Sequence, residues 1–298
     1  MSKDFLHLAG CTADELNAML DMAQELKAER KEGKMRDVLY GKTLAMIFEK
    51  PSTRTRISFE IAMLELGGHA MVLQKQDLQL GRGETVADTA QVISRYIHAV
   101  MLRAHSHATL QELAEYASVP VINGLTDMHH PCQLMADLLT MREHCGGIEG
   151  KQVAWVGDGN NMCHSWMEAA TMLGFTLRYA TPENFAPTLD LGNSDLLIPC
   201  ENAQEAVRDV DVVVTDTWVS MGDDDTLARR QSFMDLQVNA ELMSQAKDDA
   251  IFMHCLPAHR GDEVTDDVLD GPQSVVFDEA ENRLHAQKAI LLWCLGAM

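Results

Sequence analysis

Ser52-Thr53-Arg54-Thr55-Arg56 lies between two segments with different apolar patterns. The apolar run at 43–48 predicts a buried strand, whereas 57–64 has the apolar spacing of a helix. The stretch therefore falls where a strand passes into a helix. Because a helix start offers unpaired backbone N–H groups and arginines add charged donors, we expect it to bind an anion such as a small phosphorylated metabolite. The plainer alternative is a capped helix whose arginines lie in water.

Strand-like and helical segments alternate along the rest of the chain, which predicts an α/β fold with mostly parallel, open sheets. The expected strands are 43–48, 70–73, 99–103, 119–123, 152–156, 176–180, 210–215, 250–254 and 274–277. The expected helices are 13–30, 55–66, 85–96, 109–117, 133–144, one after Asn161, and 284–295. The long helix that leads into Gly146-Gly147 marks a domain boundary, so we divide the chain into domains 1–134 and 135–283. The last helix, about 284–298, is expected to pack back on the first domain.

Composition narrows the possible partners. Lys and Arg number 24 and Asp and Glu 45, a net charge of −21, which argues against binding nucleic acid or an anionic membrane. An anionic ligand would need a local positive site. The seven cysteines are scattered without a Cys-x-x-Cys pair, and no apolar run reaches membrane-spanning length. We therefore expect a soluble protein in a reducing, cytoplasmic setting.

Polar residues follow two strands of the second domain. Residues 153–156 lead into Asp158-Gly159-Asn160-Asn161, but Met162 stands where a dinucleotide fingerprint needs its third glycine. Such a turn still indicates a ligand crevice, in which the asparagines could bind a carboxylate or an amide. Asp216 follows 212–215 and could hold an ammonium group; the alternative is a carboxylate that caps a loop.

Two further motifs have open interpretations. In His130-Pro131-Cys132-Gln133, the His and Gln could reach a carbonyl oxygen and an amide, or could simply form a polar helix start. In His254-Cys255-Leu256-Pro257, the cysteine could be a nucleophile, an ionised contact to an amine, or a small buried residue. A metal site formed by His254, Cys255 and His259 is a further alternative.

Taken together and in this order, these five motifs resemble the transcarbamoylase family, and the resemblance covers essentially the whole chain. Ser52–Arg56 resembles the family's carbamoyl-phosphate loop, and His130–Gln133 its second phosphate and carbamoyl motif. Ser220-Met221-Gly222 and Cys255-Leu256-Pro257 resemble the members that use ornithine.

The resemblance implies an enzyme that transfers the carbamoyl group of carbamoyl phosphate to the δ-amine of L-ornithine, giving L-citrulline and phosphate, within arginine metabolism. It implies two domains that face a cleft and are joined by long inter-domain helices, the first binding carbamoyl phosphate and the second L-ornithine. It also implies a homotrimer or an assembly of trimers, and no metal or organic cofactor.

The resemblance also assigns site residues. To carbamoyl phosphate it assigns Ser52, Thr53, Arg54, Thr55, Gln79, Arg103, His130, Pro131, Cys132, Gln133, Cys255, Leu256 and Arg283. To ornithine it assigns Asn161, Asp216, Ser220 and Met221. The catalytic residues would be Arg103, His130, Asp216 and Cys255. Two rival interpretations remain open: a transcarbamoylase for another amine, such as putrescine or a modified ornithine, and a metabolite-binding or scaffold protein that kept the fold without the activity.

Overall fold

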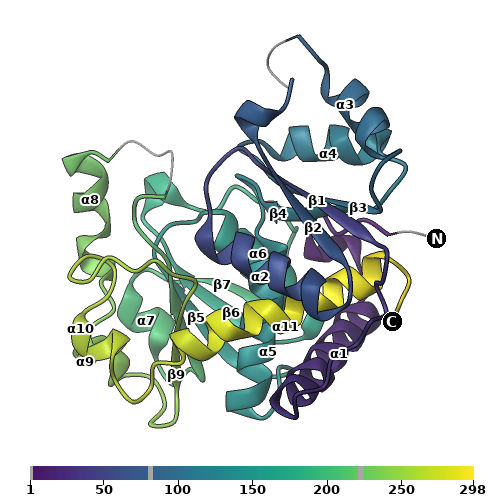
Figure 1. The fold of residues 1–298 in the computed structure, drawn as a ribbon. Coiled ribbons are helices and arrows are strands. Elements are labelled where there is room, and N and C mark those ends of the chain that lie inside the picture. Colours follow the sequence, from purple (N-terminus) through teal and green to yellow (C-terminus); the bar gives the residue numbers. More distant parts are fainter. Residues whose placement is uncertain (1–2, 80–82, 221–224) are drawn as a thin grey trace. The chain divides into compact units, whose positions relative to one another are not determined.

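The computed structural model describes residues 3–79, 83–220 and 225–298, which form two compact units (Figure 1). Unit 1 runs to Leu139 and takes in Glu281–Met298, and unit 2 is Thr140–Ala280. Both boundaries fall inside long helices, α5 (Pro131–Cys145) and α11 (Val276–Cys294). Sequence analysis placed the first boundary inside the same helix, five residues earlier.

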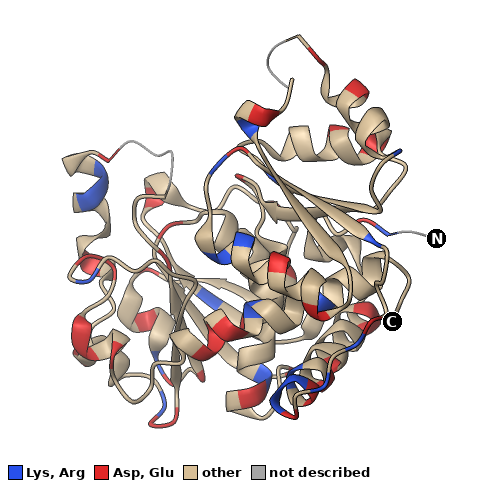
Figure 2. Cartoon of the chain, viewed as in Figure 1, with Lys and Arg blue, Asp and Glu red and all other residues tan. Residues whose placement is uncertain are grey.

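Unit 1 contains a four-stranded parallel sheet with the strand order β2-β1-β3-β4. The strands are β1 (Thr43–Phe48), β2 (His69–Gln74), β3 (Ala99–Arg103) and β4 (Val121–Leu125). The helices are α1 (Ala13–Lys31), α2 (Thr53–Glu65), α3 (Val86–Ile93) and α4 (His107–Tyr116), with short 3-10 turns η1 (Leu8–Gly10) and η2 (Lys75–Asp77). Helix α1 contains both acidic and basic residues, which are coloured red and blue along the ribbon in Figure 2.

The chain order of unit 1 creates a switch point between β1 and β3. The chain passes from β1 to β2 on one side and then returns to β3 on the other. Ligands of open α/β sheets bind at such points, beyond the carboxyl ends of the strands. Phe48 and Arg103 are paired in register at those ends, and the Glu49 amide donates to the Arg103 carbonyl at 2.9 Å. The loop to Ser52 thus begins beside Arg103.

One face of this sheet has a closed apolar core. Ala45 and Ile47 of β1 and Val100 and Leu102 of β3 point to the same face and pack with α3 and α4 through residues such as Leu110. The alternate β1 residues Leu44, Met46 and Phe48 are also buried. A strand that is buried on both faces needs a continuous apolar run, which explains the sequence of β1.

Unit 2 contains a five-stranded parallel sheet with the order β7-β6-β5-β8-β9. The strands are β5 (Gln152–Val156), β6 (Thr176–Ala180), β7 (Leu197–Pro199), β8 (Val212–Thr215) and β9 (Ile251–His254). The helices are α6 (Asn161–Leu173), α7 (Ala203–Val207), α8 (Leu227–Phe233), α9 (Ala240–Met243) and α10 (Asp266–Leu269), with η3 (Glu183–Phe185) and η4 (Met234–Leu236). The switch point lies between β5 and β8, the strands that precede Asp158 and Asp216.

The predicted α/β class is confirmed, and four strands, 43–48, 99–103, 152–156 and 176–180, are observed with the predicted bounds. The strand predicted at 274–277 is wrong. Ser274 forms one isolated bridge with Phe252, and α11 begins at Val276. Asp278 and Glu279 in the first turn of α11 favour a helix there, because acidic side chains complement a helix N-terminus. Sequence analysis missed β7 and helices α7–α10, all of which are short.

Within the described residues, no helix combines the length and the apolar character that a membrane span requires.

Truncating the core of unit 2 should destabilise it strongly. Phe252 in β9 is fully buried, so Phe252→Ala should lower the free energy of unfolding by about 3–5 kcal/mol through lost burial and the cavity left behind. Phe277→Ala is the matched control: this phenylalanine is 69% exposed, and the change should stay within about 0.5 kcal/mol. Urea unfolding of both variants measures the difference, and equal effects would contradict this account of the core.

Candidate active site

The anion-binding candidate lies at the switch point of unit 1, where α2 begins. Ser52 is the N-cap of α2, and its hydroxyl accepts a hydrogen bond from the Thr55 amide at 3.3 Å. Thr53 is exposed, Arg54 is half-buried and Thr55 is buried. The capped first turn presents backbone N–H groups next to the Arg54 side chain, which is the arrangement that suits a phosphate group.

Arg283 joins three elements of unit 1. It lies on α11 and is 3% exposed. One terminal nitrogen donates to Gln133 Oε1 on α5 at 2.5 Å, and the other donates to Thr55 Oγ1 on α2 at 3.1 Å. Gln133 in turn donates from Nε2 to Asp137 Oδ1 at 2.8 Å. The structure therefore brings together three predicted site residues that are distant in the sequence.

His130 lies next to this network, just before α5, and is buried. Burial holds its pKa well below 6.5, and the positive charges of Arg283, Arg103 and Arg54 lower the pKa further. The ring is therefore neutral at physiological pH. A neutral imidazole can still donate one N–H to a carbonyl or oxyanion. Because these charges act on His130, the three arginines must lie near it in unit 1, although they come from α2, β3 and α11.

The remaining predicted residues of unit 1 differ in environment. Pro131 begins α5, where its missing N–H is tolerated. The Cys132 thiol is fully buried and donates to the Asn123 carbonyl at 3.2 Å, and burial raises its pKa to about 12. The thiol is thus neutral and directed into the core. Gln79 is exposed in the loop after η2.

The second cluster lies at the switch point of unit 2, around Asp216. This carboxylate, 6% exposed, follows β8. Its Oδ1 accepts from the Thr217 amide at 2.8 Å and from Cys255 Sγ at 3.1 Å. Its Oδ2 accepts from Asn160 Nδ2 at 3.0 Å. The structure therefore brings the predicted Asp216 and Cys255 together, and adds Asn160.

The turn after β5 is packed tightly. Asn160 caps α6 by accepting from the amides of Met162 and Cys163, and Asn161, which is half-buried, is the first residue of the helix. A Cβ at Gly159 would approach Pro187 N to 2.3 Å, so only glycine fits there. Ser220 is half-buried after Trp218, whereas Met221 lies outside the described residues.

Sequence analysis missed Arg229, which holds this turn. It pairs with Asp158 at 2.5 Å and donates from Nε to the Trp218 carbonyl at 2.8 Å. Its guanidinium lies over the rings of Phe185 and Phe233. No motif around position 229 distinguishes this arginine from its neighbour Arg230, so only the fold could reveal its partners.

The geometry does not favour a metal site at the end of β9. Donor atoms of Asp216, His254 and Cys255 lie within 4.8 Å of one another. The His254 Nδ1, however, accepts from the Leu256 amide at 2.8 Å, and its Nε2 lies 3.2 Å from Glu263 Oε1. Both ring nitrogens are thus used to hold the strand end. Leu256 has a φ of +57°, which is a strained value for this residue type. The hydrogen bond from the Leu256 amide to His254 Nδ1 helps to hold this conformation.

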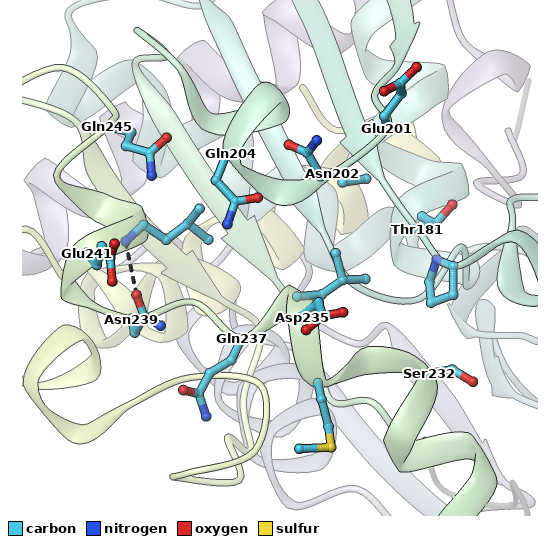
Figure 3. A pocket seen from close by; sticks show the side chains of 15 residues that line it. Thr181, Glu201, Asn202, Gln204, Ser232, Asp235, Gln237, Asn239, Glu241 and Gln245 are labelled. Carbon is cyan, nitrogen blue, oxygen red and sulfur yellow. Dashed lines mark hydrogen bonds between the residues drawn. The ribbon is translucent and has the colours of Figure 1, made fainter.

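A cavity of about 660 Å³ lies elsewhere in unit 2 (Figure 3). It is lined mainly by amides and carboxylates near the end of β6 and around α7–α9, and by none of the predicted site residues. Two of its amides cap short helices: Asn202 accepts from the Glu205 amide and Asn239 from the Leu242 amide. These contacts give the amides a structural role, so the cavity is not our candidate active site.

Two parallel sheets with polar clusters at their switch points are typical of α/β enzymes that act on small polar metabolites. Comparison with known families is more specific. The family description for the carbamoyl-P binding domain of aspartate/ornithine carbamoyltransferases matches residues 3–143, and that for the Asp/Orn binding domain matches 149–294. The chain belongs to the aspartate/ornithine carbamoyltransferase family, which confirms the resemblance predicted from its motifs.

Individual relatives are similar over nearly the full length. The ornithine carbamoyltransferase of Rhodopseudomonas palustris is 56% identical over 306 residues, covering 99% of this chain and 98% of that protein. The one from Nitrobacter winogradskyi is 56% identical over 301 residues, with the same coverage. The solved structure of ornithine carbamoyltransferase from Pyrococcus furiosus is 51% identical, with a TM-score of 0.94, and covers 100% of this chain and 98% of its own.

The neutrality of His130 predicts a pH effect on stability. Below about pH 6.5 a histidine in the unfolded chain binds a proton that the folded His130 does not, so the contribution of His130 to stability decreases as the pH is lowered, by up to about 1.4 kcal/mol per pH unit. Urea unfolding of the wild type and of His130→Asn between about pH 5 and 7.5 measures this effect. The difference in unfolding free energy, wild type minus variant, should rise with pH and level off near 6.5. A constant difference would contradict a depressed pKa.

Proposed function

We propose that this protein transfers the carbamoyl group of carbamoyl phosphate to the δ-amine of L-ornithine, giving L-citrulline and phosphate. The observation that carries the proposal is the full-length similarity to relatives named ornithine carbamoyltransferase, at 51–56% identity. The polar clusters support it, because one is rich in arginine and the other centres on a carboxylate. These are the charges that an anionic phosphate and a diamine require.

Unit 1 supplies the residues for carbamoyl phosphate in this proposal. The first turn of α2, with Ser52, Thr53, Arg54 and Thr55, binds the phosphate through backbone amides, hydroxyls and guanidinium, and exposed Gln79 adds an amide. Pro131 and Cys132 act through the backbone at the start of α5, since the Cys132 thiol is directed into the core. Gln133 and Arg283 are already hydrogen-bonded to each other and face the carbamoyl group as a pair.

Stabilisation of charge at the carbamoyl carbon is the proposed catalytic step. The amine attacks this carbon, a tetrahedral intermediate forms, and its oxygen gains negative charge before phosphate leaves. Arg103 and the neutral His130 donate to this oxygen. Loss of one such donor typically lowers the rate about a hundred- to a thousandfold. Phosphate is a good leaving group, so positioning and electrostatics are the tasks left to the protein.

Unit 2 supplies the residues for ornithine. Asp216 holds the α-ammonium, and Asn161, Ser220 and the backbone of Met221 hold the amino-acid end. Cys255 orients the δ-nitrogen, and Cys255 with Leu256 also borders the carbamoyl group. The hydrogen bond from the Cys255 thiol to Asp216 supports this assignment, because it places both groups where one ligand could contact them. The attacking amine must be neutral, so activity should rise toward alkaline pH.

The wider assignment follows the family resemblance. We propose a cytoplasmic enzyme of arginine metabolism that forms a homotrimer or an assembly of trimers. Residues 1–134 with the C-terminal helix form the carbamoyl-phosphate domain, and 135–283 form the L-ornithine domain.

A comparison of acceptors tests the reaction itself. Purified protein with carbamoyl phosphate should give citrulline from ornithine and no carbamoylated product from N-acetylornithine, putrescine or aspartate. Putrescine lacks the carboxylate that Asn161 and Ser220 would bind, and N-acetylornithine lacks the α-ammonium that Asp216 would hold. If only another amine gave a product, carbamoyl transfer would be supported, but ornithine as the acceptor would be contradicted. The absence of every product would overturn the proposed activity.

Two neighbouring arginines provide a matched test of the phosphate assignment. Arg54→Ala should lower kcat/KM for carbamoyl phosphate by at least about a hundredfold, because it removes a charged donor at the start of α2. Arg56→Ala should change it less than about threefold, since Arg56 is exposed and pairs with Glu60, at 3.4 Å, on the helix surface. Steady-state assays at saturating ornithine measure both. Similar losses in the two variants would show that general surface charge, not Arg54, attracts the substrate.

A further inference from the structure

Thr217 lies between two residues that the proposed function assigns to ornithine, Asp216 and Ser220, but has no assigned role itself. Its amide donates to Asp216 Oδ1 at 2.8 Å. Its hydroxyl donates to the Val219 carbonyl at 3.1 Å. Because that carbonyl shares a peptide plane with the Ser220 amide, the second hydrogen bond fixes the direction of the backbone at Ser220. Thr217 therefore connects the carboxylate of Asp216 with the backbone of Ser220.

A histidine from another segment of unit 2 contacts the same hydroxyl. His259 follows β9, and its Nδ1 lies 2.9 Å from Thr217 Oγ1. A hydroxyl has one proton to donate, and Thr217 donates that proton to the Val219 carbonyl. The His259 ring therefore carries a proton on Nδ1 and donates it to Thr217 Oγ1. Because the hydroxyl accepts from one residue and donates to another, its rotation is restricted.

A buried carboxylate holds His259 in place. The Glu263 side chain is fully buried, and its Oε1 accepts from the His259 amide at 2.5 Å and lies 3.2 Å from His254 Nε2. Its Oε2 lies 3.7 Å from His259 Nδ1, which favours a proton on that nitrogen. The His259 side chain itself is 49% exposed, so we expect its hydrogen bond to Thr217 to contribute little to the stability of the fold.

We propose that His259 is a positioning residue for the ornithine site and acts through the Thr217 hydroxyl. This inference rests on the proposed function, because it concerns how the amino-acid end of ornithine is held. Thr217 sets the separation between Asp216, which holds the α-ammonium, and Ser220, which contacts the carboxylate. Loss of the hydrogen bond from His259 should therefore weaken the binding of ornithine. The binding of carbamoyl phosphate, which is assigned to unit 1, should not change.

Substitutions at both ends of this hydrogen bond test the proposal. Thr217→Val removes the hydroxyl and keeps the shape of the side chain, and His259→Ala removes the donor. Each should raise KM for ornithine about five- to tenfold, the size expected for one neutral hydrogen bond, while KM for carbamoyl phosphate stays within about twofold of the wild type. The double variant should show no larger increase than either single variant, because both changes break the same interaction.

Two conservative variants and a neighbouring residue are the controls. Thr217→Ser and His259→Asn keep a hydroxyl and an N–H donor, so KM for ornithine should stay within about twofold of the wild type. Arg260→Ala should leave it unchanged, since Arg260 is exposed and pairs with Asp266 and Asp270. A change that merely destabilised the chain would lower the active fraction, and hence kcat, without raising KM for ornithine. Additive increases in the double variant, or a loss of kcat alone, would overturn the proposal.

Direct binding separates this inference from the proposed reaction. Titration calorimetry with L-ornithine in the presence of inorganic phosphate measures a dissociation constant without turnover, and it should rank the variants in the same order as KM. If the wild type formed no citrulline but the Thr217→Val and His259→Ala variants bound ornithine more weakly, the reaction would be overturned and the role of His259 supported. Citrulline formation with equal ornithine affinity in every variant would overturn the role of His259 alone. No binding and no citrulline would overturn both.

Discussion

The buried guanidinium of Arg283 ties three helices of unit 1 together at the candidate site. A charge that is removed from water is tolerated only where hydrogen-bond acceptors surround it, and leaving a buried donor without its acceptor typically costs about 1–3 kcal/mol, or more where the donor is charged. Thr55 and Gln133 provide acceptors from α2 and α5. The first turn of α2 and the first turn of α5 therefore have to lie where Arg283 can reach both. These are the turns that carry the two motifs proposed to bind carbamoyl phosphate, so one structural requirement also positions the candidate site.

The two units use the same construction with opposite charge. In each unit the strand order changes direction at a switch point between two central strands. Polar residues follow the carboxyl ends of those strands. Unit 1 places arginines there, and unit 2 places Asp216 with Asn160 and Cys255 as donors to it. The positive site of unit 1 is thus a local departure from a chain with a net charge of −21. Such a site attracts an anion by its immediate donors, since long-range attraction from an acidic protein is absent.

Much of the fold and of the candidate site could be predicted, because the sequence patterns that indicate them are local. The apolar run of β1, the cap at Ser52 and the polar ends of the strands are all readable within about ten residues. The errors have the opposite origin. Short helices such as α7 lack enough turns to show a period. The run at 274–277 is as apolar as a strand, although α11 begins within it at Val276 and has acidic residues in its first turn. The partners of Arg229 and Arg283 come from distant segments, so no local pattern reveals them.

The electrostatics around His130 carry one further consequence for the proposed reaction. The arginines that would attract the phosphate are also charges that keep His130 neutral. Binding a dianion beside them would offset their positive field, so the pKa of His130 would rise when carbamoyl phosphate is bound. Burial remains the largest cause of the depressed pKa, and it is not removed by the substrate. The imidazole would therefore stay neutral but become a better match for negative charge that develops later. Because the ring carries no charge in the ground state, its N–H contributes most when the oxyanion forms, which is the condition for an interaction to accelerate a reaction.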